Sequence, residues 1–571
     1  MATTLKKTNV VIIGLGAAGG VACLPLAQAG LEVIGLEAGS WLSTSDMAPD
    51  ELKLSRGLWP PGPQKTKIEG LTSRANASQN ATRANHPMMN AVGGTSVHYM
   101  AQSWRLNPWD FKVRSETVRR YGASRIPKGS TVEDWPLTYE DLEPYYDHVE
   151  YEIGVSGKAG NLGGKKDERG NIFEGPRRRD YPMPALRTSG YMEKMAAAGK
   201  SLGWHPFIAP AAITSKAYEG RPGCAYHGYC IGAGCHINAK SSTAVTTIPK
   251  AMKAGKFSIV TEARVTTLET DGTGRITGVN YLKDGTEYFQ PADAVLLGSY
   301  IYENVRLLLL SKSKAYPNGL ANNHGQVGRH YFSHNQGGAV SALFPFNLNN
   351  WYGTPGQGIA IDNWADDNFD HSGLDFIGGG TLYVYTERRP IAAVNGVQAW
   401  MPQGGTNWGS KWKAFVKENA DRSNGAYLQK TTLPYEDNYL DLDPVVKDPL
   451  GFPVTRITAE YKDNERKIGV YIAEKMKQWY MAAGAIRVNG TGNVGGAMGA
   501  STHAYGGTRM GGNPETNVVD KWGFSHEAPN LGILGGSVMG TSGARNPTQT
   551  IQALAWRTAE HLVKNWKNIV S

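Results

Sequence analysis

A glycine-rich turn near the N-terminus has the spacing of a dinucleotide-binding motif. The motif is Gly14-x-Gly16-x-x-Gly19, and Glu37 ends the next apolar, strand-like run. Gly14 would make the tight turn, Gly16 would let the backbone approach a pyrophosphate, and Gly19 would let a helix pack closely on a strand. The N-terminus of that helix would face the phosphates, and Glu37 could accept hydrogen bonds from the adenosine ribose. We therefore predict a bound dinucleotide rather than a purely structural turn; the acidic Glu37 argues against NADP, but the motif does not separate FAD from NAD.

Three of the four cysteines are also spaced like a possible set of metal ligands. Cys224, Cys230 and Cys235 form a C-x5-C-x4-C pattern, whereas Cys23 falls in the first predicted helix. This pattern does not resemble the disulfide framework of a small secreted domain. Thiolates are natural ligands of iron–sulfur clusters. The trio is therefore a candidate ligand set, with buried free thiols, or one disulfide in an exported protein, as the alternatives.

The elements that must position the glycine motif are readable from hydrophobic periodicity. Residues 9–37 predict a strand, a turn, a helix and a second strand, and the apolar runs at both ends are β-branched like buried parallel strands. Residues 258–297 predict a β-meander with two Asp-Gly turns, followed by a helix near 302–311. Short runs interrupted by Gly, Trp and Asn over 336–460 suggest an antiparallel sheet. Further helices are expected at 138–142, 188–202, 463–483 and 548–566.

Length and charge restrict the class of protein. A chain of 571 residues exceeds the size at which one hydrophobic core keeps growing, so two lobes are expected. The net charge of +9 is modest, and the densest basic cluster, Arg177–Arg179, is more typical of a solvated loop than of a nucleic-acid site. The sequence contains no run of about 18 apolar residues, so no membrane span is predicted. Residues 1–9 contain no apolar signal region or twin arginine, so we expect no export signal in this chain.

Further segments resemble the signatures of the glucose–methanol–choline (GMC) oxidoreductases. Residues 92–99, of sequence VGGTSVHY, resemble that family's flavin-contacting loop. Residues 294–299 with 304–309 resemble its second signature, where a strand returns to the FAD-binding fold. Segments that resemble its catalytic block lie at 503–511, 518–520, 535–537 and 546–548. The resemblance runs from Val10 to Leu562, and on it the chain is identified as a member of the family.

This resemblance implies an α/β fold, α+β overall, of two domains. The first is a Rossmann-like FAD-binding domain made of residues 1–110, 215–335 and 491–571. The second is a substrate-binding domain built on an antiparallel sheet, as in p-hydroxybenzoate hydroxylase, and made of residues 111–214 and 336–490.

The resemblance also makes FAD the expected cofactor. The residues expected to hold it are Gly14, Gly16, Gly19, Glu37, Gly93, Gly94, Ser96, His98, Val265, Gly535, Asn546, Pro547 and Thr548. Some family members attach FAD covalently through a histidine at the position of His98, so covalent attachment there is a hypothesis. The last helix opens after Asn546, and its N-terminus can favour negative charge on the reduced flavin ring.

Two residues carry the chemistry that the resemblance implies. His503 would be the general base that takes the hydroxyl proton of the substrate while hydride leaves for flavin N5, because the pKa of imidazole lies near neutral pH. Asn546 would hydrogen-bond the substrate oxygen as charge develops. The alternatives are a structural histidine in a glycine-rich turn and a turn-forming asparagine before proline. For the cysteine trio, related sugar dehydrogenases carry a [3Fe-4S] cluster on a similar C-x5-C-x3-C pattern.

Within the family, the chain is most similar to the flavoprotein subunits of bacterial gluconate 2-dehydrogenases. The segments that carry this similarity are residues 119–122, 368–371 and 437–444. It implies oxidation of a secondary alcohol of a sugar or sugar acid to a ketone, with electrons passed to a cytochrome or quinone. It also implies a small subunit, a cytochrome c subunit and a location on the periplasmic side of the inner membrane, reached through a partner's export signal; the alternative location is the cytoplasm.

Other activities of this fold are kept as alternatives. One is a glycoside or pyranose 3- or 2-oxidase, or a glucoside 3-dehydrogenase, with the same site. Another is a protein similar to hydroxynitrile lyases, in which flavin is a structural part. A third is a catalytically silent homologue, which the presence of both His503 and Asn546 disfavours.

Overall fold

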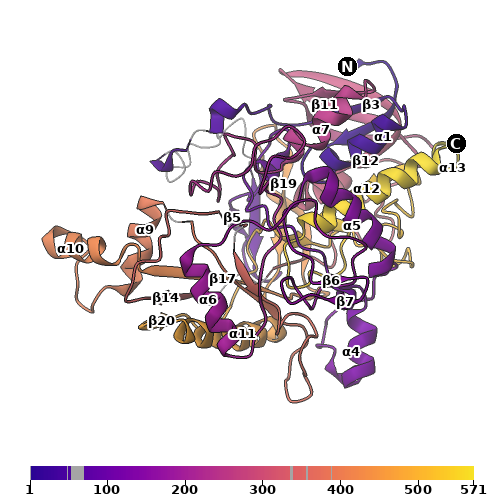
Figure 1. The fold of residues 1–571 in the computed structure, drawn as a ribbon. Coiled ribbons are helices and arrows are strands. Elements are labelled where there is room, and N and C mark those ends of the chain that lie inside the picture. The colour runs from indigo at the N-terminus through magenta and orange to yellow at the C-terminus, as the bar shows by residue number, and fades with distance from the viewer. Residues whose placement is uncertain are drawn as a thin grey trace.

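Two β-sheets organise the computed structural model, and the chain passes between them several times (Figure 1). The structure describes residues 2–47, 49–52, 70–334, 339–354, 356, 358–387 and 389–571. The chain thus has the mixed α/β architecture that the sequence predicts. The residue boundaries of the two predicted domains remain a prediction.

The first sheet has eight strands and combines parallel with antiparallel pairing. Its main order is β10-β11-β12-β2-β3-β9, and β1 and β22 both pair with β12. The strands are β1 (Thr3–Thr4), β2 (Thr8–Ile13), β3 (Val33–Leu36), β9 (Phe257–Val260), β10 (Arg264–Thr270), β11 (Ile276–Lys283), β12 (Thr286–Leu297) and β22 (Leu531–Ile533). β9 pairs in parallel with β3, at the opposite end of the sheet from β10. The antiparallel meander therefore begins at Arg264 and not at residue 258 as predicted.

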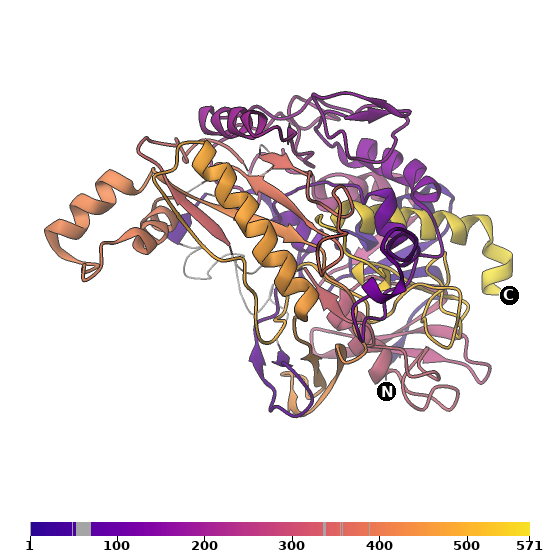
Figure 2. The same ribbon diagram turned by 90° about the horizontal axis from the view of Figure 1, so that it is seen from below.

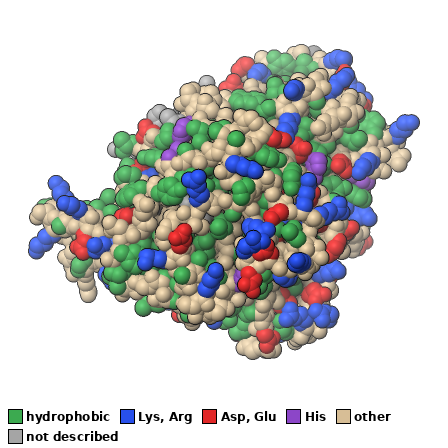
Figure 3. Space-filling model, in the orientation of Figure 1, with side chains coloured by type: hydrophobic (Ala, Val, Ile, Leu, Met, Phe, Trp, Pro, Cys, Tyr) green, Lys and Arg blue, Asp and Glu red, His purple; other side chains and the backbone are tan. Residues whose placement is uncertain are grey.

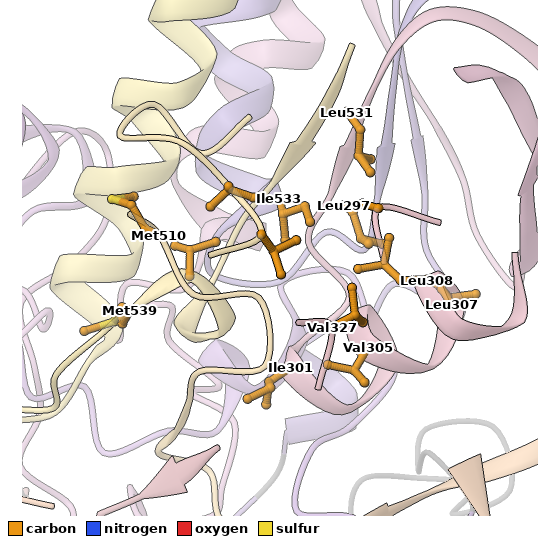
Figure 4. Packing of buried hydrophobic residues seen from close by; sticks show 14 of the residues in the cluster. Leu297, Ile301, Val305, Leu307, Leu308, Val327, Met510, Leu531, Ile533 and Met539 are labelled. Atoms are coloured by element: carbon orange, nitrogen blue, oxygen red, sulfur yellow. The ribbon is translucent and has the colours of Figure 1, made fainter. Parts of the chain in front are cut away.

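Helices cover both faces of this sheet. Alternate residues of β2 point to opposite faces, so Val10 and Ile12 pack in one core and Val11 and Ile13 in another. The first core contains α1 (Gly19–Gln28), α7 (Thr247–Lys253) and α12 (Thr548–Lys564). The second contains α8 (Ile301–Leu310), whose Ile301, Val305 and Leu308 lie beside Leu297 and Ile533 (Figure 4). Burial on both faces explains why β2 is a continuous apolar run.

The second sheet has six strands, all antiparallel, in the order β20-β14-β17-β16-β15-β8. The strands are β8 (Pro206–Ile208), β14 (Val340–Leu343), β15 (Ile359–Ile361), β16 (Gly380–Val384), β17 (Ser423–Lys430) and β20 (Arg487–Asn489). The long helix α11 (Asp463–Ala482) lies along this sheet (Figure 2) and buries Ile468, Ile472, Met476 and Trp479 against it. The sheet and the helix match the antiparallel region and the amphipathic helix predicted from the sequence.

A helical arm projects beyond the second sheet (Figures 1 and 2). It contains α9 (Pro390–Val397) and α10 (Gly409–Asn419), which the sequence analysis placed within the antiparallel sheet.

On the face shown in Figure 3, acidic and basic side chains are interspersed over the surface. No helix in the described part of the chain is both long and apolar enough to cross a membrane.

The remaining elements are a further sheet, two short strand pairs and several helices. A four-stranded sheet contains β4 (Leu71–Arg74), β5 (Thr82–Ala84), β18 (Tyr439–Lys447) and β19 (Pro453–Thr458). Two short pairs join β6 (Asn161–Leu162) to β7 (Lys165–Lys166), and β13 (Phe332–Ser333) to β21 (Ala504–Tyr505). The other α-helices of the described residues are α4 (Val113–Tyr121), α5 (Tyr139–Ile153), α6 (Gly190–Ser201) and α13 (Trp566–Val570). The β13–β21 pair matters most for function, because it joins residue 334 to the segment that carries His503.

Candidate active site

A cavity of about 390 Å³ lies between residues of the two sheets. Its volume is within the range of small-molecule and cofactor pockets. The predicted site residues that line it are Gly14, Gly16, Glu37, Gly94, Ser96, His98, Val265, His503, Gly535, Asn546, Pro547 and Thr548. Gly19 and Gly93 do not line it. The cavity therefore brings together segments from both ends of the chain.

The glycine motif forms a backbone cradle at one part of this cavity. Gly14 has φ +83°, and a Cβ there would lie 2.8 Å from the carbonyl oxygen of Gly298. A Cβ on Gly94 would lie 2.8 Å from the Cα of Gly16, so these two loops meet backbone to backbone. Gly19 lies behind the turn, where a Cβ would be 2.0 Å from the carbonyl oxygen of Gly14. Its role is therefore the close packing of α1 on β2.

Glu37 is fixed at the end of β3. Its Oε2 accepts from the backbone N–H of Leu15 at 2.9 Å, and its Oε1 accepts from that of Gly39 at 2.9 Å. Burial raises the pKa of Glu37 to about 7, and these backbone hydrogen bonds act in the opposite direction. The carboxylate of Glu37 can accept hydrogen bonds from the adenosine ribose of FAD. The backbone of the glycine turn and the N-terminus of α1 can hold the pyrophosphate.

His98 follows the short 3₁₀ helix η2 (Gly94–Val97) and lines the same cavity. Burial, and then the positive charge of Lys240, lowers the pKa of His98 to about 4. The imidazole is therefore neutral at physiological pH. A neutral ring nitrogen can act as a nucleophile, whereas an imidazolium cannot.

The two predicted catalytic residues are in contact. His503 Nε2 lies 3.3 Å from Asn546 Nδ2. His503 directly precedes β21, and Asn546 lies just before α12, so the contact joins two segments of the C-terminal region. Burial, and then His334, holds the pKa of His503 well below its ordinary value. A neutral imidazole beside an amide N–H can bind one hydroxyl, taking its proton while the amide donates to its oxygen.

His334 is a site residue that the sequence analysis missed. Its Nδ1 lies 3.0 Å from Nδ1 of His503, and its Nε2 lies 3.0 Å from the carbonyl oxygen of Gly543. Its backbone N–H also donates to the carbonyl oxygen of His503 at 3.0 Å. The β13–β21 pairing creates this contact between residues far apart in sequence, and no local pattern could have revealed it.

Two further residues that the sequence analysis missed hold the amide of Asn546. Trp104 Nε1 donates to Asn546 Oδ1 at 3.0 Å, and Gln429 Nε2 donates to the same oxygen at 2.9 Å. Gln429 lies in β17, so the contact ties Asn546 to the second sheet. Trp104 and Gln429 belong to segments without a recognisable motif.

A buried ionic cluster anchors the chain next to Asn546. Arg545 Nη2 lies 2.6 Å from Asp362 Oδ2, and Arg545 Nη1 lies 2.5 Å from Asp366 Oδ2. Asp110 lies nearby, and burial together with the charge of Asp366 raises its pKa. The acidic groups come from loops near the second sheet, so the cluster fixes the entry into α12 from that side.

The cysteine trio does not form the predicted metal site. Cys23, Cys224, Cys230 and Cys235 are all free thiols. Burial raises the pKa of Cys224 to about 12 and also raises that of Cys230. In the described part of the chain, no three or more His, Cys, Asp or Glu side chains are arranged to hold a metal ion. The structure therefore gives no support to the [3Fe-4S] prediction; the three cysteines are free thiols, and Cys230 is buried whereas Cys224 and Cys235 are partly exposed.

Comparisons with known proteins show which proteins the chain resembles. Family models described as GMC oxidoreductase match residues 128–336 and 434–555. The gluconate 2-dehydrogenase flavoprotein of Pantoea cypripedii is 32% identical, over 98% of this chain and 94% of its own. The 2-methyl-1,2-propanediol dehydrogenase of Mycolicibacterium austroafricanum is 29% identical, over 100% and 98%. The fructose dehydrogenase large subunit of Gluconobacter japonicus is 27% identical, over 99% and 100%.

Solved structures show the same fold. Pyridoxine 4-oxidase from Mesorbium loti superposes with a TM-score of 0.62 at 14% identity, over 97% of this chain and 99% of its own. An Aspergillus oryzae RIB40 formate oxidase variant gives a TM-score of 0.58 at 15% identity, over 100% of both chains.

Proposed function

Because this chain belongs to the GMC oxidoreductase family and acts on CH–OH groups, we propose that it oxidises a secondary alcohol of a sugar or sugar acid to a ketone. The observation that carries the proposal is the contact between His503 and Asn546 in a cavity that also contains the glycine cradle. Bound FAD would supply the hydride acceptor. The relatives named for gluconate and fructose support a carbohydrate substrate for this chain.

The protein's own residues bind the hydroxyl and move its proton. The substrate hydroxyl would accept through its oxygen from Asn546 Nδ2 and donate its O–H to His503 Nε2; these two nitrogens lie 3.3 Å apart. His503 is neutral because burial lowers its pKa, so its lone pair is available at neutral pH. The contacts of Trp104 and Gln429 with Asn546 Oδ1 hold the amide in place while charge develops on the oxygen.

Electron transfer to a cytochrome or quinone, through partner subunits, is part of the same proposal. The relative named as a large subunit supports the presence of at least one partner subunit, and the small subunit and cytochrome c subunit are part of the proposal. A partner's export signal would then take the complex to the periplasmic side of a bacterial inner membrane. Co-expression with candidate partner subunits, followed by fractionation, tests this part; a chain that stays monomeric and cytoplasmic in its native host would contradict it.

Covalent attachment of FAD at His98 is a separate proposal. The neutral imidazole of His98 lines the cavity, and a neutral ring nitrogen could form the bond. Acid precipitation of the holoenzyme tests it, because covalently held flavin stays with the protein pellet. Release of all yellow colour into the supernatant would rule the bond out.

An anaerobic substrate screen tests the main proposal. The purified holoenzyme is mixed with gluconate, fructose, other sugars, glycosides and small diols, and loss of visible flavin absorbance is followed. Bleaching by a carbohydrate supports the assignment, whereas bleaching by none of them contradicts it and favours a flavin with a structural role. Comparison of peroxide formation with reduction of an artificial dye then separates an oxidase from a dehydrogenase.

A further inference from the structure

Both ring nitrogens of His503 are engaged by protein groups. Nδ1 faces Nδ1 of His334 at 3.0 Å, and Nε2 faces Nδ2 of Asn546 at 3.3 Å. In a neutral imidazole one nitrogen carries the proton and the other is an acceptor. His503 can take a proton from the cavity only if Nε2 is the unprotonated nitrogen. The neighbouring groups decide which tautomer is present.

One chain of hydrogen bonds starts at a backbone carbonyl. The oxygen of Gly543 can only accept, so His334 Nε2, 3.0 Å away, must carry a proton. Burial lowers the pKa of His334 to about 4, so the ring is neutral and its Nδ1 has no proton. An unprotonated Nδ1 can only accept. His503 Nδ1 must therefore carry the proton that this contact requires.

A second chain starts at an indole. Trp104 Nε1 can only donate, so the Asn546 atom 3.0 Å from it must be the oxygen. Gln429 Nε2 donates to the same oxygen at 2.9 Å. The remaining end of the Asn546 amide is thus the NH₂ group, which can only donate. His503 Nε2, which faces this group, must therefore be an acceptor.

We propose that His334 and Trp104 are positioning residues that fix His503, from two opposite sides, as the tautomer protonated on Nδ1. The two chains begin at independent groups and require the same tautomer. The proposal rests on the proposed role of His503 as the base and extends it to groups that do not touch the substrate.

This arrangement also defines the fate of the proton. When the substrate O–H bond breaks, the proton forms an N–H bond at His503 Nε2, and His503 becomes an imidazolium while His334 stays neutral. The Nδ1–H of His503 then donates a charge-assisted hydrogen bond to His334, which is stronger than the neutral one. The hydroxyl of Tyr505 lies 3.1 Å from Nδ1 and 3.3 Å from Nε2 of His334, and so restrains that ring.

Neutron diffraction from crystals of the holoenzyme soaked in D₂O at neutral pH tests the tautomer directly. We expect deuterium on Nδ1 of His503 and on Nε2 of His334, and none on Nε2 of His503. Deuterium on His503 Nε2 would overturn the proposal. This result does not depend on turnover, so it stands apart from the substrate screen: a protein that bleaches with no alcohol refutes the proposed function but can still show either tautomer.

Variants test the consequence for the reaction. H334L removes the acceptor of His503 Nδ1–H and should slow flavin reduction about 100-fold or more with little change in KM, because the tautomer that carries its proton on Nε2 then gains population and cannot accept the substrate proton. H334N keeps an acceptor oxygen in place of Nδ1 and should recover most of the rate. W104F should also lower kcat more than it changes KM, because the Asn546 oxygen then keeps only the Gln429 donor, whose amide can rotate together with that of Asn546. Wild-type kcat in both H334L and W104F would overturn the proposal.

A matched control removes a buried histidine elsewhere. His371 Nε2 lies 2.9 Å from the carbonyl oxygen of Gly378 and does not line the cavity. H371L should lose thermal stability in the way H334L does, but keep the wild-type rate of flavin reduction. If H334L fails to fold, H334N, W104F and the neutron density still decide the question.

Discussion

Arg545, the residue before Asn546, forms a buried ion pair with Asp366, and Arg545 Nη1 lies 2.5 Å from Asp366 Oδ2. The pair lies outside the substrate-facing part of the site, yet it determines how the chain enters α12. Removal of one partner leaves the other charge buried and unpaired. The free energy of folding lost in this way is larger than the net stabilisation that the intact pair provides.

We expect R545M to lower the free energy of unfolding by about 3–5 kcal/mol, because Asp362 and Asp366 lose their counter-charge. Urea denaturation of the holoenzyme measures this. The control is R466M, which removes an ion pair of 2.9 Å between Arg466 and Asp463 at the surface. R466M should lower the free energy of unfolding by less than about 1 kcal/mol. Equal effects of the two substitutions would show that the buried cluster is not an anchor.

Loss of the proposed base should slow the reductive half-reaction. We expect H503A to reduce the rate of anaerobic flavin reduction by about two to four orders of magnitude, the usual contribution of a positioned general base. N546A should lower the rate by about 10²–10³-fold, as expected for loss of a donor to developing negative charge. Stopped-flow measurement of flavin bleaching decides both. FAD content must be unchanged, and a rate close to wild type for H503A would refute its assignment.

The pH dependence of flavin reduction should reflect the burial of His503. Burial, and then His334, holds its pKa well below the ordinary 6.5, so the neutral, active form persists as the pH falls past that value. The rate should therefore stay constant between about pH 8 and pH 6.5 and be lost only at lower pH, where the imidazole gains a proton. Stopped-flow rates across this range give the apparent pKa. A midpoint at or above 6.5 would contradict the expected direction.

The backbone contact between the two glycine loops should be essential for cofactor binding. Gly94 has φ +53°, and a Cβ would lie 2.8 Å from the Cα of Gly16. G94A should therefore be purified with much less FAD, because the loops must separate to admit the methyl group. Gly190 provides the control, since a Cβ there meets nothing within 4 Å and its φ is not positive. FAD-to-protein ratios from absorbance spectra decide the comparison, and full occupancy in G94A would exclude this role.

Local patterns predicted the elements that hold the cofactor motif. The β2–α1–β3 unit could be predicted because Gly14, Gly16 and Gly19 lie between two β-branched apolar runs, and the contacts among these three elements are short in sequence. The amphipathic α11 followed from the same kind of periodicity. The arm helix α10 could not be predicted, because much of it is exposed and it has no long apolar stripe.

The support around the catalytic pair depends on contacts that sequence order does not show. His334 reaches His503 through the two-residue pairing of β13 with β21, and Gln429 reaches Asn546 from the second sheet. Tertiary packing creates these contacts, so a motif can indicate the base but not the groups that orient it. The cysteine spacing predicts a cluster that the arrangement of the side chains does not support, because spacing alone does not say how three thiols are placed in the fold.

The cavity contains Gly14 from the first βα turn and Asn546, Pro547 and Thr548 from the start of the last long helix. During translation, a ribosome that has released the glycine turn has not yet released these closing residues. The nascent chain can thus fold its first βαβ unit early but cannot enclose a cofactor until synthesis is nearly finished. Flavin loading is therefore a late step in the biogenesis of this enzyme, and chains that terminate before the last helix would emerge without a complete pocket.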